Sequence, residues 1–138
     1  MIRTLKSSAA VVMGLALVSA GAYAADRPYE ETMKEVGAAC GSLKKNLDAK
    51  SNDAAGADAA KLEKLYKEVH KFWAKKKTDE AAKLSKDGQV AAKSIVKASK
   101  GGDAAAMSTG FQSLLATCKG CHSKYREKGP DGKWKIKA

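Results

Sequence analysis

The five residues Cys118-Lys119-Gly120-Cys121-His122 close the last long apolar pattern of this 138-residue chain. Residues three apart lie on one face of a helix, so the thiols of Cys118 and Cys121 point to the same side. His122 follows directly, and Gly120 leaves out a side chain where a flat ligand would come close. The rest of the chain must then surround this face.

The spacing C-x-x-C-H is typical of c-type haem attachment. Cys118 and Cys121 can each bond one vinyl group of a single porphyrin, and His122 can be the proximal iron ligand. A thioredoxin-type disulfide is an alternative, but such a motif follows a strand, and none is visible. A zinc site would need a further ligand such as Cys40 or His70. We therefore predict one covalently bound haem c per chain.

Residues 1–24 have the pattern of a secretory signal peptide. They begin with basic residues including Arg3, continue with a short apolar run over 9–18, and end in the small-x-small site Ala22-Tyr23-Ala24. The run is too short for a comfortable membrane span. We expect cleavage, a mature domain over 25–138, periplasmic location and no stable membrane association, with an uncleaved anchor as the alternative.

The mature chain favours helices throughout. It is rich in alanine and lysine, and the whole sequence has only two prolines. Residues 48–56 are small and polar and predict a loop, and Gly88 could kink or break a helix. No run is read as a strand. Apolar residues at spacings of three and four predict four helices, over 28–46, 58–73, 79–99 and 104–127.

Four amphipathic helices with short connections predict an all-α, up-down-up-down four-helix bundle. The haem would lie near the C-terminus of the fourth helix. Met33 is about 9 Å from the start of the first helix and His122 about 7 Å from the end of the fourth, at similar heights on antiparallel neighbours. Met107, about 22 Å from His122, cannot reach the opposite side. Met33 is thus a candidate distal ligand, although a plain core methionine is common at such a position.

The chain resembles the class II cytochromes c, which include the cytochromes c′ and their low-spin relatives. The resemblance is specific over Thr117–Arg126 and modest at Met33-Lys34 followed by Gly37. The connector 100–103 is also similar. In low-spin members a methionine at the first-helix position is the sixth iron ligand, which implies a one-electron carrier rather than an enzyme. In cytochromes c′ a bulky apolar residue leaves the iron five-coordinate, so a protein that binds gases (NO or CO) is the alternative.

The sequence also departs from this family. Members often carry an arginine four residues before the methionine, where it can meet a haem propionate, and here that residue is Tyr29. Arg27 lies two residues earlier, and its ability to substitute stays open. Residues 48–84 contain no family motif, and the stretch after Arg126 is longer than usual.

Several other residues near the predicted site can be interpreted in more than one way. Tyr125 continues the seam of the fourth helix and is expected to pack near the porphyrin. Arg126 is either a propionate contact or a solvated cation at a helix end. Phe72 is expected in the core, while Trp73 could serve the core or the haem edge. His70 reads as a surface or edge histidine, with iron ligation in place of Met33 as the alternative.

Cys40 reads as a small buried hydrophobe, with an intermolecular disulfide as the alternative in an oxidising compartment.

The formal net charge of the chain is +11. A basic surface at the haem end would attract an acidic redox partner and speed association, or simply remain solvated. Nucleic acid is a poor partner, because no recognition motif is present. The alanine-rich faces permit a homodimer without requiring one. The lysines concerned are Lys119, Lys124, Lys128, Lys133, Lys135 and Lys137.

Overall fold

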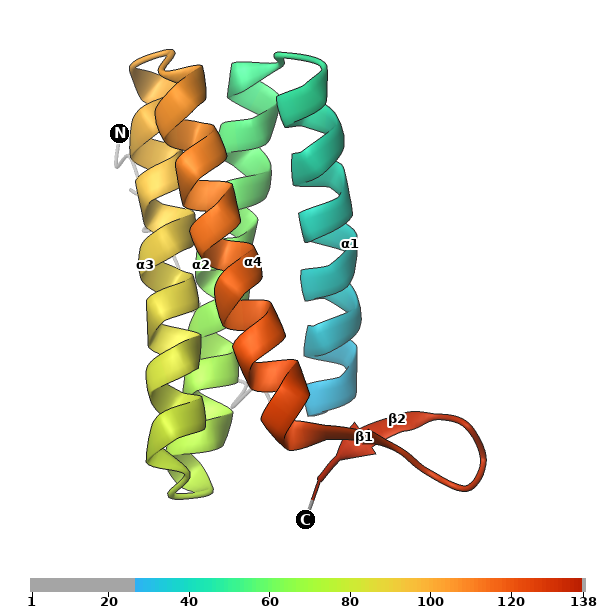
Figure 1. Cartoon of the computed structure of the whole chain (residues 1–138). Helices are drawn as coiled ribbons and strands as arrows, with labels where there is room; N and C mark the ends of the chain where they lie inside the picture. The colour runs from blue at the N-terminus through green and yellow to red at the C-terminus, as the bar shows by residue number, and fades with distance from the viewer. Residues whose placement is uncertain (1–26, 138) are drawn as a thin grey trace, which may run out of the picture.

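The computed structural model describes residues 27–137, which form four long helices and a short β-hairpin (Figure 1). The predicted signal peptide over 1–24 lies outside the described residues. Successive helices run in opposite directions, and this confirms the predicted all-α four-helix bundle. The elements are α1 (Tyr29–Asp48), α2 (Asn52–Lys75), α3 (Asp79–Lys100), α4 (Ala104–Tyr125), β1 (Arg126–Lys128) and β2 (Trp134–Ile136).

The helix ends follow local chemistry. Gly102 turns the chain after α3 in a left-handed conformation with φ of 67°, which glycine adopts at little cost. Asp103 then caps α4, because its carboxylate accepts a hydrogen bond of 2.9 Å from the backbone N–H of Ala106. Glu30 and Glu31 lie in the first turn of α1, where negative charge stabilises the helix dipole.

The predicted loop over 48–56 is wrong for most of its length. α2 begins at Asn52 instead of residue 58, so residues 49–51 alone connect it to α1. Gly56, read as a turn residue, is buried inside α2, and a Cβ atom there would lie 2.2 Å from Ser99 Oγ. The glycine therefore permits close packing between α2 and α3, and the neighbouring alanines keep the helix intact.

The possible break at Gly88 does not occur, because α3 is continuous through it. A Cβ atom on Gly88 would come within 2.5 Å of Tyr66 Cε1. The ring of Tyr66 occupies the space that the missing side chain leaves. Here too the glycine allows two helices to approach, and the cost of glycine in a helix interior is offset by packing.

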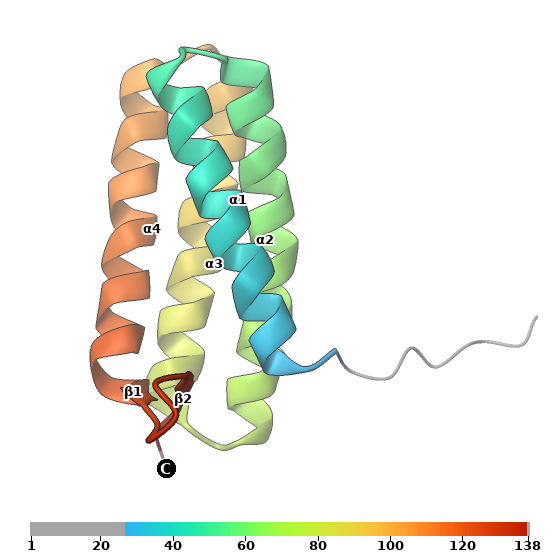
Figure 2. The ribbon, with the colours of Figure 1, turned by 90° about the vertical axis from the view of Figure 1, so that its right-hand side faces the viewer.

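The end of α4 and the hairpin differ from the prediction as well. α4 ends at Tyr125, two residues before the predicted limit of 127, and Arg126 has an extended backbone. β1 and β2 pair antiparallel, with Arg126 opposite Ile136, and Lys137 N–H donates to the carbonyl of Tyr125 at 2.9 Å. Strands of three residues are too short to show a reliable alternation in sequence. The hairpin lies at the end of the bundle where α4 ends (Figure 2).

The core consists of the four apolar helix faces. α2 packs extensively on α1 and α3, and α3 on α4, whereas α1 and α4 contact each other much less. The bundle is therefore tightly closed on three sides and loose on the fourth. No helix among residues 27–137 is long and apolar enough to cross a membrane. The largest fully buried side chains are Leu43, Leu62, Ile95, Met107 and Leu114.

Gly88 and Gly41 provide a matched test of this packing. Gly88→Ala should destabilise the protein by about 1–3 kcal/mol, because the added methyl group meets the buried ring of Tyr66. Gly41 is exposed in α1, and a Cβ atom there would meet nothing within 4 Å, so Gly41→Ala should stabilise by roughly 0.5–1 kcal/mol through helix propensity. Thermal and denaturant unfolding measure both. Equal effects of the two changes would contradict the packing role of Gly88.

Candidate haem site

The loosely packed side of the bundle holds a cavity of about 880 Å³ between α1 and α4. Its volume falls within the range of small-molecule and cofactor sites. α1 and α4 form its two walls, side chains of α2 and α3 form its back, and the hairpin closes one end. All six predicted site residues line it, namely Met33, Cys118, Cys121, His122, Tyr125 and Arg126.

Cys118 has two polar neighbours in the cavity. The hydroxyl of Tyr66 lies 3.0 Å from its Sγ atom, and the thiol of Cys40 on α1 is the other polar neighbour. These contacts, with that of Cys40 the largest, lower the pKa of the Cys118 thiol to about 6 and outweigh its burial. The same contact and burial raise the pKa of Cys40, and burial raises that of Cys121. These shifts belong to free thiols, since a thioether carries no proton.

His122 is half-buried, and its pKa is lowered first by burial and then by the charge of Arg126. Both effects favour the neutral imidazole, the form that binds metals. Arg126 Nη1 lies 3.3 Å from His122 Nδ1. A guanidinium can only donate, so this contact places the imidazole proton on Nε2. Iron ligation through Nε2 would need the proton on Nδ1, and Arg126 would then give up this contact.

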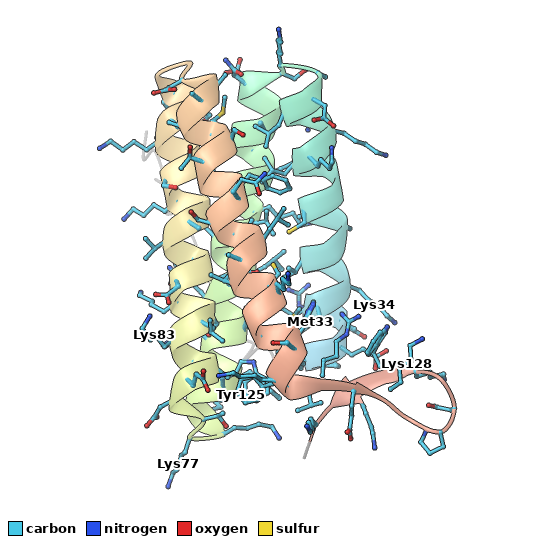
Figure 3. All side chains as sticks on the ribbon, in the orientation of Figure 1. Met33, Lys34, Lys77, Lys83, Tyr125 and Lys128 are labelled. Atoms are coloured by element: carbon cyan, nitrogen blue, oxygen red, sulfur yellow. The ribbon has the colours of Figure 1, made fainter. Side chains whose placement is uncertain are left out.

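The α1 wall faces this motif. Met33 is half-buried on the side of α1 that lines the cavity, between α1 and α4 (Figure 3). Gly37 lies one turn further on the same face, and a Cβ atom there would meet nothing within 4 Å. A thioether sulfur and an open stretch of backbone therefore lie across the cavity from the cysteines and His122. The structure thus brings Met33 and His122 to one cavity from opposite walls.

An aromatic cluster joins α1, α2 and α4 at the hairpin end of the cavity. Tyr29 stacks on Phe72 with ring centroids 4.2 Å apart, and Trp73 Nε1 donates to the Tyr29 hydroxyl at 3.1 Å. Burial raises the pKa of Tyr29 to about 12, so this side chain carries no charge at neutral pH. Trp73 is buried in the core and also lines the cavity, so the core interpretation is confirmed and a contact with the haem edge stays a prediction. The ring of Tyr125 lies 5.2 Å from that of Trp73.

Two residues weighed in the sequence lie away from the cavity. His70 Nδ1 is 2.9 Å from the carbonyl of Ala82, and the histidine does not line the cavity. Arg27 pairs with Glu35 and, at 2.7 Å, with Glu68, so it does not replace the family arginine at the cavity. Within residues 27–137, no group of three or more His, Cys, Asp or Glu side chains is arranged to hold a metal ion, which leaves the zinc alternative without support.

The residues present fit a covalently bound haem. Two thiols three residues apart, an imidazole and a thioether line one cavity, and the lining is predominantly apolar as a porphyrin requires. Gly37 leaves space where any other side chain would project. Cys118 and Cys121 would hold such a group, His122 and Met33 would ligate its iron, and the group would supply a one-electron couple.

Sequence reasoning missed the contributions of Tyr66 and of the hairpin to the cavity. Tyr66 adjoins the predicted stripe of α2 at Leu65 and Val69, so its position near the core could have been found from helical spacing. The hairpin left a weaker signal. The turn residues 129–132 followed by the mixed segment 133–136 are compatible with a hairpin, but no strand of usual length is present.

The bond between Trp73 and Tyr29 can be tested by stability. Tyr29→Phe leaves the buried Trp73 N–H without its acceptor and should cost about 1–3 kcal/mol. Tyr125→Phe is the matched control, because the Tyr125 hydroxyl donates to the exposed carboxylate of Glu80 at 3.0 Å and its loss should leave stability near that of the wild type. Denaturant unfolding of the haem-loaded protein compares them. If both substitutions lower the free energy of unfolding by the same amount, the buried Trp73–Tyr29 hydrogen bond contributes no more to stability than the exposed one.

Comparison with known proteins supports the same assignment. Residues 71–126 match the family model of cytochrome c′. This range covers the end of α2, all of α3 and α4, and the C-x-x-C-H motif, but not Met33. The comparisons found no similar protein among curated sequences and no similar solved structure. The match is consistent with the resemblance to the class II cytochromes c and supports a c-type cytochrome.

Proposed function

We propose that this protein is a one-electron carrier with a single haem c, ligated by His122 and Met33. The observation that carries the proposal is the position of Met33, which lines the same cavity as His122 but from the opposite helix. Haem attachment would occur through thioether bonds from Cys118 and Cys121. The protein would turn over no substrate.

The surroundings of Met33 and His122 suit electron transfer. A methionine opposite histidine raises the reduction potential of haem iron. The apolar lining limits solvent access and lowers the local dielectric, which also tunes the potential. Tyr66, Val69 and Trp73 supply much of this lining from α2, a helix packed firmly on both α1 and α3. Ligands held by a rigid bundle need little rearrangement when the charge of the site changes.

A five-coordinate, gas-binding protein is the second candidate. The family model that matches residues 71–126 is that of cytochrome c′, and this favours the alternative. The matched range includes the proximal His122 but does not extend back to α1, so the residue at position 33 was not part of the match. The two functions differ in the occupant of the sixth coordination position, which makes Met33 the residue to test.

The proposed location and partners rest on sequence features and charge. Export to the periplasm follows from the signal pattern over 1–24. Of the six lysines near the haem end, Lys124 pairs with Glu80 and Lys135 with Glu127. The other four, Lys119, Lys128, Lys133 and Lys137, are exposed and remain to attract a redox protein with an acidic docking surface. The effect would act mainly on the association rate and weaken with salt.

Met33→Leu tests the proposed distal ligand. The wild-type ferric spectrum should show a low-spin iron with a weak far-red methionine–iron band. The variant should become high-spin, bind carbon monoxide readily when ferrous and show a lower potential, since axial-ligand identity moves haem potentials over about 0.8 V. Met107→Leu is the matched control, because Met107 is buried in α4 and does not line the cavity.

Absorption spectra and redox titration of the three proteins decide between the functions. A wild-type protein that is already high-spin, or a Met33→Leu spectrum identical to the wild type, would overturn the role of Met33 and favour gas binding. A matching change in Met107→Leu would trace the effect to loosened packing.

The attachment residues form a separate test. Cys118→Ala and Cys121→Ala should each lose one thioether bond, which shifts the pyridine haemochrome absorption, and the double variant should release all colour on acid–acetone extraction. Cys40→Ala removes a thiol that lines the same cavity but lies outside the motif, so it should retain both thioether bonds. Colour that leaves the wild-type protein with the solvent would contradict covalent attachment.

A further inference from the structure

The rim of the cavity carries an excess of positive charge. Five charged side chains line the cavity besides His122, namely Glu30, Lys34, Arg126, Lys133 and Lys135. Lys34 pairs with Glu30 at 3.6 Å, and Lys135 pairs with Glu127 at 3.4 Å. Within residues 27–137, no carboxylate pairs with Arg126 or with Lys133. Two cations at the cavity thus lack an acidic partner from the described part of the chain.

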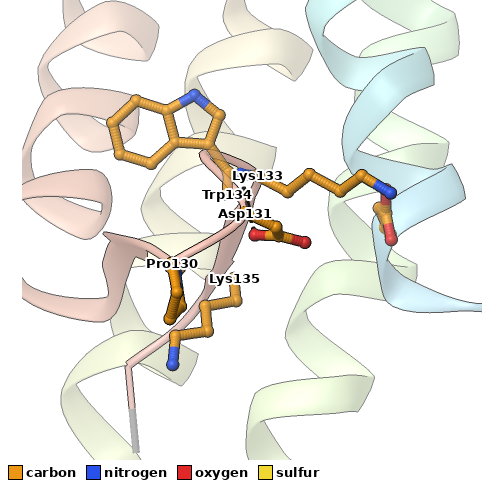
Figure 4. Close-up of a pocket in the computed structure, with 7 residues that line it drawn as sticks. Pro130, Asp131, Lys133, Trp134 and Lys135 are labelled. Carbon is orange, nitrogen blue, oxygen red and sulfur yellow. Dashed lines mark hydrogen bonds between the residues drawn. The ribbon is translucent and has the colours of Figure 1, made fainter.

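The hairpin positions both of these cations. The guanidinium of Arg126 stacks on the ring of Trp134 at 3.7 Å, and Lys128 lies over the same ring at 5.2 Å. Arg126 and Trp134 lie on neighbouring paired strands, so the pairing fixes their separation. Figure 4 shows Trp134 between α4 and α1, and Lys133 extending from the hairpin toward α1. Arg126 and Lys133 therefore both line the cavity at its hairpin end, where Trp134 lies as well.

The charge pattern matches the polar end of a haem. A haem carries two propionate groups, which are carboxylates and are stabilised by charge-assisted hydrogen bonds. Tyr29 occupies the first-helix position where relatives often have arginine, and it is uncharged. Arg27 is already paired with Glu35 and Glu68. The first helix thus offers no unpaired arginine to the cavity.

We propose that the C-terminal hairpin forms the propionate-binding end of the haem site, with Lys133 binding one propionate and Arg126, held by Trp134, binding the other. This inference rests on the haem of the proposed function but not on the identity of the sixth ligand. It gives the segment after Arg126 a role in the binding site. It also accounts for the exposed Trp134 as the support for a guanidinium that loses its contact with His122 when the iron is ligated.

Lys133→Gln and Lys137→Gln provide a matched pair on the haem-loaded protein. Each removes one positive charge from the end of the hairpin, but Lys137 does not line the cavity. Resonance Raman spectra report propionate hydrogen bonding through the propionate bending bands. Lys133→Gln should shift one of these bands and lower the reduction potential, because a lost cation favours the ferric state. Lys137→Gln should leave the bands in place and change the reduction potential several-fold less than Lys133→Gln does.

Trp134→Leu tests the support for Arg126. It keeps every charge but removes the stacked ring, so it should shift the second propionate band. Unchanged bands in both Lys133→Gln and Trp134→Leu, or equal effects of Lys133→Gln and Lys137→Gln, would overturn the proposal while leaving the haem assignment intact. If Met33→Leu changes only the spin state of the iron, the result concerns the sixth ligand and not the propionates. A purified protein without haem would contradict both proposals.

Discussion

The ring of Tyr66 fills the space beside Gly88, and its hydroxyl lies 3.0 Å from Cys118 Sγ. This one side chain joins the closely packed α2–α3 pair to the cysteine motif of α4. A similar close approach joins α4 to α3, since a Cβ atom on Gly110 of α4 would come within 2.6 Å of Ile95 Cγ1 on α3. α3 is thus closely packed against both α2 and α4. The remaining freedom in the bundle lies on the side where α1 meets α4.

The position of α1 is set by its contacts with α2 rather than with α4. At one end, Tyr29 stacks on Phe72 and accepts from Trp73, and at the other Asn46 donates to Asp58 at 2.7 Å. α1 is therefore held at both ends while its middle faces the cavity. This arrangement allows Met33 to face His122 without the helices collapsing onto each other. The contacts of α1 with α2 would therefore fix the spacing between Met33 and His122, the two residues proposed as iron ligands.

The sequence predicted the parts of this structure that depend on regular spacing. Cys118, Cys121 and His122 follow from three-residue spacing in a helix, and Met33 follows from antiparallel topology and helical rise. The prediction from sequence was wrong where a glycine can either interrupt a helix or allow close packing within one. Gly56 ends the predicted loop and Gly88 reads as a possible helix breaker, yet each allows a side chain that is remote in sequence to approach its helix. The hairpin was not predicted because strands of three residues are too short to show a reliable alternation in sequence.

The family match covers only part of the candidate site that the structure defines. The matched range over 71–126 holds Cys118, Cys121 and His122, the residues proposed to attach a c-type haem and ligate its iron. Met33 and Lys133 lie outside it, on α1 and the hairpin. Attachment needs the fixed spacing within one helix, whereas the sixth ligand and the cavity rim depend on how other elements pack against that helix. Chemistry that varies from one relative to another would then arise in these elements, because they can change without disturbing the motif.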